Sequence, residues 1–398
     1  TLYEETTMSE QEIYEGLLNW LKKGGISGLP EADELLPMIK ATYTPEEASL
    51  LTGMPFSGKN LEELAEMKQM DPAVLGEQLD GLARKGLVFR IVKGDTVRYS
   101  LNEGFFVDYR SSWWGGNTDE RTKGIAPWVN QYYYHGGWDQ LKDTHTKYLR
   151  ALPIEGTIED PREIRPYEEV RKVLDQHDYF SVSTCCCKHR KNLDPEFEDS
   201  RYPTEVCLHF GGLGRYIDEN GMGRQITRQE AEEILRESAE AGLVHGVANW
   251  EKAPDTICNC DPDCCIFFEA FHKLKHAEGM SSSNYRVRVD SETCIGCGLC
   301  VKRCPMYALE LKDAPEAKDR ITVVEDEEKG KKELKNRKGR VSTVNPDQCV
   351  GCGVCVYRCP SKSLVLERKE VLEDPPQHVR DLGQRVMAEM AAAGRRGR

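Results

Sequence analysis

The chain has 398 residues, of which 39% are hydrophobic and 30% are charged, and its formal net charge is −13. This size and composition are typical of a globular protein with two to four domains, and no stretch approaches the roughly 20 apolar residues of a membrane-spanning helix. The acidic balance argues against a nucleic-acid-binding surface. Because residues 1–9 lack the basic start and apolar centre of a signal peptide, we expect a cytoplasmic protein.

Residues 44–101 predict a winged helix, which consists of three helices followed by a β-hairpin. The first helix begins at Thr44 and Pro45, and the second covers the sequence LEELAEMKQ. The third helix begins at Asp71 and ends at Lys85. The runs GLVFRIV and TVRYSL then alternate as the two strands of the hairpin.

The charge of this N-terminal region bears on its role. We count 19 acidic and 11 basic side chains over residues 1–110, and the predicted third helix carries Asp71, Glu77 and Asp80. Phosphate binding needs the opposite sign of charge. We therefore expect a winged-helix-like domain that docks another protein, with DNA binding as the alternative.

Residues 111–160 are rich in aromatic residues and glycine and show little periodicity. Trp113, Trp114, Trp128 and Trp138 lie here, together with three adjacent tyrosines. We expect a loop-rich linker packed on its neighbours, or else an aromatic anchor for an interface, where Trp and Tyr are favoured.

All 16 cysteines lie between Cys185 and Cys359. Disulfides are rare in a reducing compartment, so this number of cysteines indicates metal or iron–sulfur ligation. Half of the cysteines fall in the central part of the chain, and the other half fall in two regular C-terminal runs.

The central cysteines occur in three short sequences, STCCCKHR, TEVCLHFGG and ICNCDPDCC. Because the side chains of adjacent residues diverge, neighbouring cysteines rarely bind the same cluster. For one extra cluster we expect four ligands: Cys187, Cys207, Cys258 and Cys260. Three further cysteines would serve a second cluster or act as redox thiols: Cys185, Cys264 and Cys265. The alternative is that several of these cysteines are simply buried as small hydrophobic side chains.

A helix is predicted between the central cysteines, at residues 227–243. Thr227 and Glu230 form a capping box at its start, and Gly242 ends it. This helix would be the scaffold that brings Cys207 together with the cysteines of ICNCDPDCC.

Residues 161–268 resemble a cysteine-rich module of multi-cluster iron–sulfur proteins of anaerobes. The resemblance rests on the TCCCKHR, YPTEVCLHFG and ICNCDPDCC sequences. In this chain Ser200, Asp261 and Asp263 stand where the module has cysteines. The resemblance implies metal binding and leaves the number of clusters open.

The two C-terminal runs, DSETCIGCGLCVKRCP and NPDQCVGCGVCVYRCP, repeat at an offset of 55 residues. In the spacing C-x-x-C-x-x-C-x-x-x-C-P, three thiolates each reach a different iron of one cubane. The fourth cysteine opens a short helix and points away, toward the neighbouring cluster. By this rule one [4Fe–4S] cluster is bound by Cys294, Cys297, Cys300 and Cys359. The other is bound by Cys349, Cys352, Cys355 and Cys304.

The residues around these cysteines fit the same interpretation. Four glycines would let the backbone approach the sulfides closely, and two prolines would fix the turn into each helix: Gly296, Gly298, Gly351, Gly353, Pro305 and Pro360. Residues 281–367 resemble the two-[4Fe–4S] ferredoxin family. A pair of zinc knuckles is the alternative, but zinc sites do not need the third cysteine and the following proline.

Residues 312–340 form an insert between the two runs. The insert carries 10 basic and 8 acidic side chains, and the sequences ITVV and RVSTV at its ends predict the two strands of a hairpin. We interpret it as a solvated excursion, with a docking surface as the alternative.

These patterns together predict a multidomain α+β protein. The predicted parts are a winged-helix-like docking domain at 1–110, an aromatic linker at 111–160, a cysteine-rich α domain at 161–280, a two-[4Fe–4S] ferredoxin domain at 281–367 and a tail with one exposed helix at 368–398.

The predicted function is that of an electron-transfer subunit, which relays low-potential electrons to or from a partner oxidoreductase in an anaerobe. One alternative is an oxidoreductase with a catalytic central cluster or thiol pair. The other is a redox-sensing winged-helix regulator. The expected partner is a redox protein or complex rather than nucleic acid or a membrane, and assembly into a homo-oligomer is left open.

Overall fold

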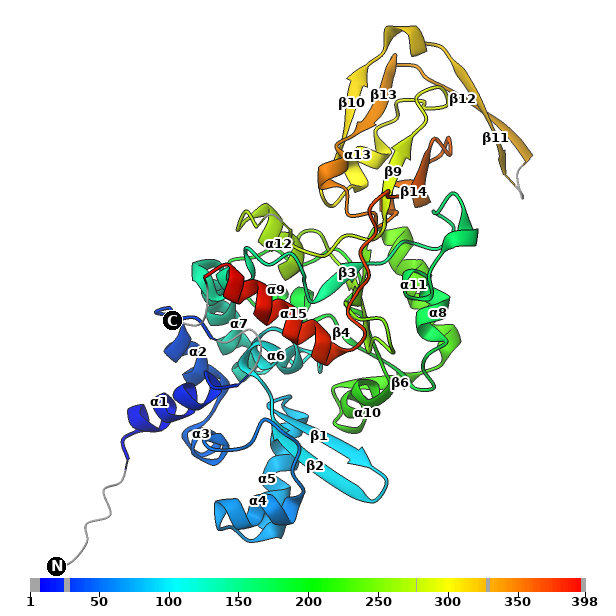
Figure 1. The fold of residues 1–398 in the computed structure, drawn as a ribbon. Coiled ribbons are helices and arrows are strands. Elements are labelled where there is room, and N and C mark those ends of the chain that lie inside the picture. Colours follow the sequence, from blue (N-terminus) through cyan, green and yellow to red (C-terminus); the bar gives the residue numbers. More distant parts are fainter. Residues whose placement is uncertain (1–7, 25–28, 277, 327–329, 395–398) are drawn as a thin grey trace, which may run out of the picture. The chain divides into compact units, whose positions relative to one another are not determined.

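The computed structural model describes residues 8–24, 29–276, 278–326 and 330–394 (Figure 1). The chain divides into two compact units. Unit 1 consists of residues 1–144, 179–227 and 386–398, and unit 2 consists of residues 145–178 and 228–385. The central cysteines are therefore divided between the two units, whereas both C-terminal runs lie in unit 2.

Unit 1 begins with helices and a β-hairpin: α1 (Glu10–Leu21), α2 (Leu35–Thr42), α3 (Pro45–Leu51), α4 (Leu61–Lys68), α5 (Pro72–Arg84), β1 (Val88–Lys93) and β2 (Thr96–Leu101). The three helices and the hairpin predicted from the sequence are thereby confirmed. The side chain of Thr44 begins α3 as expected, since its hydroxyl accepts a hydrogen bond from the backbone N–H of Glu47 at 3.2 Å. The identification of this region as a winged helix stays a prediction.

The aromatic segment that follows is more regular than predicted. After α6 (Gly104–Tyr109) it forms α7 (Glu120–Tyr132), so the expectation of a loop-rich linker is wrong over α7. Pro127 lies inside this helix, and it is a residue that normally disfavours one. The tryptophans do pack in the interior, since Trp113, Trp114 and Trp138 are all buried.

The rest of unit 1 contains three antiparallel strands with helices: β4 (Phe180–Thr184), α9 (Cys186–Asn192), β5 (Glu205–Phe210), α10 (Gly211–Glu219) and β6 (Gly223–Ile226). Strand β4 pairs with β5 on one side and with β6 on the other. Helix α10 packs against these strands.

Unit 2 contains three further antiparallel strands, with helices: β3 (Leu149–Ala151), α8 (Val170–Leu174), α11 (Arg228–Ala241), β7 (Val244–Ala248), β8 (Thr256–Cys260) and α12 (Ile266–His272). Strand β7 pairs with β3 and with β8. The helix predicted at 227–243 is confirmed as α11.

The prediction of a central α domain is wrong, because residues 161–280 also contain five strands, β4 to β8. Short runs such as YFSVST and TICNC are rich in β-branched and aromatic residues, which favour strands. Their cysteines and serines weaken the apolar pattern by which a strand is usually found.

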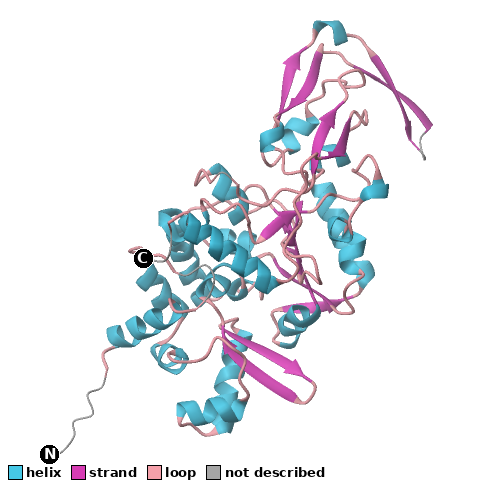
Figure 2. Cartoon of the chain, viewed as in Figure 1, coloured by secondary structure: helices cyan, strands magenta, loops and turns pink. Residues whose placement is uncertain are grey.

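The C-terminal part of unit 2 has the following elements: β9 (Tyr285–Val289), α13 (Leu299–Arg303), β10 (Leu309–Asp313), β11 (Ile321–Asp326), β12 (Gly330–Lys335), β13 (Arg340–Val344), α14 (Val354–Tyr357) and β14 (Leu364–Arg368) (Figure 2). Strand β9 pairs antiparallel with β14, and β10 pairs antiparallel with β13. Each pair joins a strand from one half of the repeat to a strand from the other half. The core between them contains Tyr285, Val287, Leu309, Leu364 and Leu366.

The insert forms strands at the predicted positions but with different partners. ITVV belongs to β11, which pairs with β12, whereas RVSTV is β13, which pairs with β10. The prediction that these two sequences form one hairpin is therefore wrong. Strand β12 has the sequence GKKELK, and its charged residues do not predict a strand, so the sequence did not identify it as the partner of β11.

Short 3-10 or π turns connect these elements: η1 (Ser111–Trp113), η2 (Tyr133–Gly137), η3 (Asp139–Leu141), η4 (Pro161–Glu163), η5 (Pro166–Glu168), η6 (Pro315–Ala317) and η7 (Pro346–Gln348). The tail forms α15 (Val379–Ala392), in which Leu382 and Val386 are buried, so this helix is not wholly exposed as predicted. None of the described helices is long and apolar enough to cross a membrane.

Candidate metal centres

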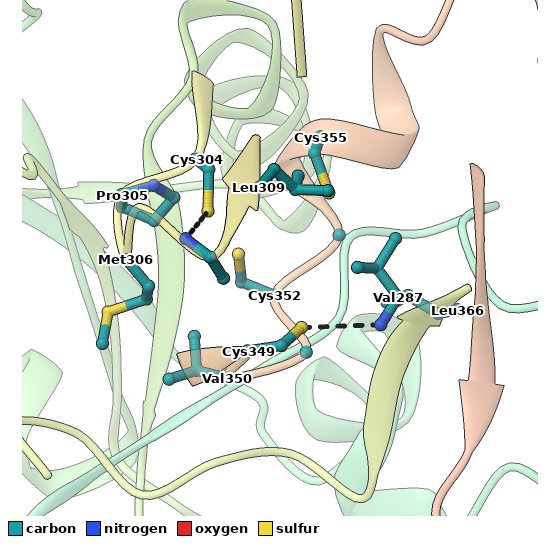
Figure 3. A pocket seen from close by; sticks show the side chains of 13 residues that line it. Val287, Cys304, Pro305, Met306, Leu309, Cys349, Val350, Cys352, Cys355 and Leu366 are labelled. Atoms are coloured by element: carbon teal, nitrogen blue, oxygen red, sulfur yellow. Dashed lines mark hydrogen bonds between the residues drawn. The ribbon is translucent and has the colours of Figure 1, made fainter. Parts of the chain in front are cut away.

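Four cysteines of unit 2 line one cavity (Figure 3). Cys349, Cys352 and Cys355 come from the second C-terminal run, and Cys304 comes from the first. We call this set site II. Its remaining lining is apolar or backbone, with side chains from Val287, Pro305, Met306, Ala308, Leu309, Val350 and Leu366.

The electrostatics of site II favour a bound cation. Burial, and after it the neighbouring thiols of Cys304 and Cys349, raise the pKa of the Cys352 thiol to about 12. Burial also holds the pKa of Cys355 well above its usual range. Thiolates in this cavity would repel one another, so they need positive charge between them, which the irons of a cluster supply.

The other four C-terminal cysteines form a second set, which we call site I. Burial raises the pKa of the Cys300 thiol, and the thiols of Cys359, Cys297 and Cys294 are close enough to raise it as well. Cys294 and Cys300 are buried, whereas Cys297 is exposed. Cys359 thus lies with three cysteines of the opposite run, as Cys304 does in site II. This is the crossed arrangement that the spacing predicts, and the assignment of iron ligands stays a prediction.

The short helices of the two cysteine runs, α13 and α14, do not lie where the sequence predicted them. Helix α13 ends at Arg303, immediately before Cys304, and α14 ends at Tyr357, two residues before Cys359. The fourth cysteine of each run therefore follows a helix instead of opening one. Pro305 and Pro360 follow in turn, and they cannot extend a helix because proline lacks the backbone N–H.

Glycine is required at two positions of the cysteine loops. Gly351 and Gly296 have φ of +68° and +64°. A Cβ atom on Gly351 would lie 2.2 Å from the carbonyl oxygen of Tyr285 in β9, and one on Gly296 would lie 2.3 Å from that of Arg340 in β13. These glycines therefore let each loop press against a strand, which fixes the position of the cysteines on that loop.

Hydrogen bonds to sulfur differ between the two sites. In site I the Ser342 N–H donates to Cys294 Sγ at 3.4 Å, and the Ser342 hydroxyl lies 3.3 Å from Cys300 Sγ. The hydroxyl of Ser361 lies 3.7 Å from Cys359 Sγ.

In site II the bonds to sulfur come from backbone groups. Val287 N–H donates to Cys349 Sγ at 3.5 Å, and Ala308 N–H donates to Cys304 Sγ at 3.3 Å (Figure 3). Both hydrogen bonding and solvent exposure tune the reduction potential of a cluster. The exposed Cys297 and the serine hydroxyls therefore distinguish site I from site II.

The central cysteines of unit 1 gather where β4 passes into α9. Cys185 caps α9, and Cys186 and Cys187 are its first two residues. The pKa of Cys186 is held well above its usual range by a hydrogen bond with Cys187, by burial and by the nearby thiols of Cys207 and Cys185. Sequence reasoning left Cys186 out, because it assumed that adjacent side chains diverge. Cys186 and Cys187 nevertheless share a hydrogen bond at the start of α9, so that assumption fails here.

The central cysteines of unit 2 gather at the end of β8. Cys258 and Cys260 are two residues apart on this strand, and Cys265 caps α12. Hydrogen bonds with Cys258 and Cys265, followed by burial, hold the pKa of the Cys260 thiol well above its usual range. Cys264 is also buried.

The central cluster predicted from the sequence combines thiols of both units. Cys187 and Cys207 belong to unit 1, whereas Cys258 and Cys260 belong to unit 2. That ligand set stays a prediction.

Comparison with known proteins agrees with the C-terminal geometry. Residues 293–363 match the family model of the 4Fe-4S dicluster domain. Ferredoxin-3 of Nostoc sp. is 40% identical over 72 residues, which are 18% of this chain and 67% of that protein. Ferredoxin-3 of Rhodobacter capsulatus is 30% identical over 78 residues, which are 20% of this chain and 76% of that protein. Through this C-terminal domain, the chain belongs to the ferredoxin family with a 4Fe-4S dicluster domain.

Larger relatives match this chain over a small part of their own length. A pyruvate-flavodoxin oxidoreductase of Rhodospirillum rubrum is 40% identical over 76 residues, which are 18% of this chain and 6% of that protein. The polyferredoxin protein MvhB of Methanothermobacter marburgensis is 32% identical over 102 residues, which are 22% of this chain and 24% of that protein. No solved structure matches the chain.

The close packing of Gly351 gives a first prediction. Gly351→Ala should lower the iron content by about four irons per chain, the content of one cubane, because the added methyl group displaces the loop of site II from β9. Gly330→Ala is the matched control, since Gly330 also has a positive φ, +71°, but no atom within 4 Å of an added Cβ. Equal iron content in the two variants, measured after anaerobic purification, would contradict this role of Gly351.

The hydroxyl of Ser342 gives a second prediction. Ser342→Ala should lower the potential of the site I cluster by about 20–60 mV, which corresponds to one hydrogen bond of about 0.5–1.5 kcal/mol for a one-electron couple. Ser342→Thr should restore the potential, and the cluster of site II should be unaffected in both variants. The measurement is a redox titration followed by electron paramagnetic resonance. An unchanged titration in Ser342→Ala would show that this hydroxyl does not tune the cluster.

Proposed function

We propose that this chain is an iron–sulfur electron-transfer subunit, which relays low-potential electrons to or from a partner oxidoreductase. The observation that carries the proposal is the pair of crossed thiol sets at sites I and II. Each set takes three cysteines from one run and one from the other, which is the ligand pattern of a two-cluster ferredoxin. When bound, each [4Fe–4S] cluster accepts and donates one electron.

The residues of the domain would perform distinct tasks in this relay. The eight C-terminal thiolates hold the irons, and the apolar lining of site II keeps water away from its cluster. The N–H groups of Val287 and Ala308 and the hydroxyl of Ser342 stabilise the negative charge on the cysteine sulfurs. The paired strands β9–β14 and β10–β13 hold the two sites in fixed positions.

We also propose that the central cysteines hold one or two further clusters. The supporting observation is that thiols gather in both units, around Cys186 in unit 1 and around Cys260 in unit 2. Deprotonating buried thiols that lie this close together costs free energy unless a cation compensates the negative charge. These centres would extend the relay beyond the two C-terminal clusters.

The N-terminal region would dock the partner oxidoreductase. Asp71 at the N-cap of α5 and Glu77 within the helix are exposed, and Asp80 of the same helix pairs with Arg90 of β1 at 3.0 Å. An acidic helix of this kind suits a protein partner better than a phosphate backbone, which supports docking over a DNA-binding regulator.

A second candidate function is that of an oxidoreductase with a thiol pair in unit 2. It is favoured by the hydrogen bonds that join the Cys260 thiol to Cys258 and Cys265. Two neighbouring thiols release two electrons and two protons when they form a disulfide, and the disulfide takes up two electrons and two protons when it is reduced. A cluster held by these cysteines would bind iron, whereas a thiol pair would not.

The test is iron and sulfide analysis after anaerobic purification, together with reduction of methyl viologen by the dithionite-reduced and desalted protein. We expect about 8 irons per chain from sites I and II and about 12 or 16 with one or two central clusters. Cys258→Ser/Cys260→Ser should lose about four irons if these thiols hold a cluster, and none if they form a redox pair. A colourless protein that transfers no electron to viologen would refute the electron-transfer function.

A further inference from the structure

The two C-terminal sites differ in what surrounds them within unit 2. Site II is covered by the chain itself. The N–H of Ile154 donates to the carbonyl oxygen of Cys352 at 3.1 Å, and the N–H of Ser283 donates to that of Val350 at 3.0 Å. The Nε2 atom of His272, the last residue of α12, also lies 2.6 Å from the carbonyl oxygen of Pro305.

The segments that cover site II are also connected to the elements that carry the central cysteines of unit 2. Helix α12 begins directly after Cys265 and spans seven residues, so it is about 10 Å long. Two residues before Ile154, the N–H of Leu152 donates to the carbonyl oxygen of His245 in β7, which stands opposite Asn259 in β8. Site II is therefore at the end of the ferredoxin domain that faces the rest of unit 2.

Site I is at the opposite end of the domain, where the insert contacts the first cysteine loop. The side chain of Asn336 is buried and donates to the carbonyl oxygen of Cys294 at 3.0 Å. The hydroxyl of Thr322 donates to the carbonyl oxygen of Thr293 at 2.9 Å. These bonds fix the insert to the first cysteine loop, while Cys297 on the same loop remains exposed.

Three exposed basic residues adjoin the segments that form site I. Arg337 and Lys338 directly follow Asn336, and Arg358 directly precedes Cys359. All three are exposed, and none of them makes an ion pair with any residue that the structure describes. Other basic residues of the insert are compensated, since Arg340 pairs with Asp313 at 3.0 Å and Arg320 lies 3.5 Å from Glu292.

We propose that this face, made of Cys297, Arg337, Lys338 and Arg358, is the docking surface for an acidic one-electron carrier protein. The proposal rests on the proposed electron-transfer function. It adds the charge of the partner and the surface at which the partner binds. Uncompensated positive charge on a chain of net charge −13 would orient an acidic partner toward this face. Complexes between electron-transfer proteins are small and transient, so a few such charges suffice to steer the encounter.

Leu299 supports the same assignment. It lies two residues after Cys297 at the start of α13, and 37% of its surface is exposed. An apolar side chain beside an exposed ligand lets a partner exclude water near the cluster, while the surrounding charges guide the approach.

The test is the charge-reversal variant Arg337→Glu/Lys338→Glu, studied by stopped-flow reduction of two carriers of opposite charge. The first carrier is a flavodoxin with net negative charge, and the second is a basic cytochrome c. At low ionic strength the variant should reduce the flavodoxin about tenfold more slowly than the wild type and the cytochrome c faster. Both differences should fade toward 0.5 M salt, because screening removes steering between exposed charges.

The matched control is Arg171→Glu/Lys172→Glu in α8, which changes the charge equally. The side chains of Arg171 and Lys172 are 61% and 55% exposed, and α8 lies well away from the insert strands within unit 2 (Figure 1). This control should leave both rates within about twofold of the wild type. Iron content of both variants should equal that of the wild type.

Two results would overturn the docking assignment: unchanged rates with both carriers, or equal slowing with both. Failure of the wild type to reduce either carrier and also methyl viologen would instead refute the electron-transfer function itself. The two failures are therefore distinguishable in one set of measurements.

Discussion

Mutual repulsion among buried thiolates is the constraint on which the rest of this structure depends. Burial alone raises the pKa of Cys352 and Cys355, and each neighbouring thiol adds to the effect. A protein that gathers such groups must either keep them protonated or place a cation between them. The regular spacing of the eight C-terminal cysteines, and their match to the 4Fe-4S dicluster domain, favour the second solution. The fold then positions the thiolates so that they can bind irons.

The crossed arrangement follows from how the two halves of the repeat are joined. Strand β9 precedes the first run and pairs with β14 after the second, while β10 and β13 form the other pair. Each half therefore contributes a strand to both pairs and a cysteine to both sites. The loops are pressed against these strands by Gly296 and Gly351, so the position of each thiol depends on both halves. This mutual dependence fixes two sites at once, with site II covered by the chain and site I left open at Cys297.

The sequence predicted best where chemistry dictates spacing. A cubane requires thiols at set intervals, so Cys294 and its seven partners could be assigned to two sets without a structure. Helix α3 was equally predictable, because its start is encoded locally in Thr44 and Glu47. Long-range pairing was not predictable: the partner of β13 is β10, and nothing in RVSTV itself specifies that choice. Cys186 was missed for a related reason, since its proximity to Cys207 of β5 and its hydrogen bond with Cys187 depend on the folded structure.

The measurement that tests the crossed arrangement most directly compares three single-cysteine variants by electron paramagnetic resonance after reduction with dithionite. Cys294→Ala and Cys349→Ala each remove a ligand from a different site, so their spectra serve as references for the loss of one cluster or the other. The account predicts that the spectrum of Cys359→Ala matches that of Cys294→Ala, although Cys359 belongs to the run of Cys349. A spectrum of Cys359→Ala that matches Cys349→Ala would contradict it.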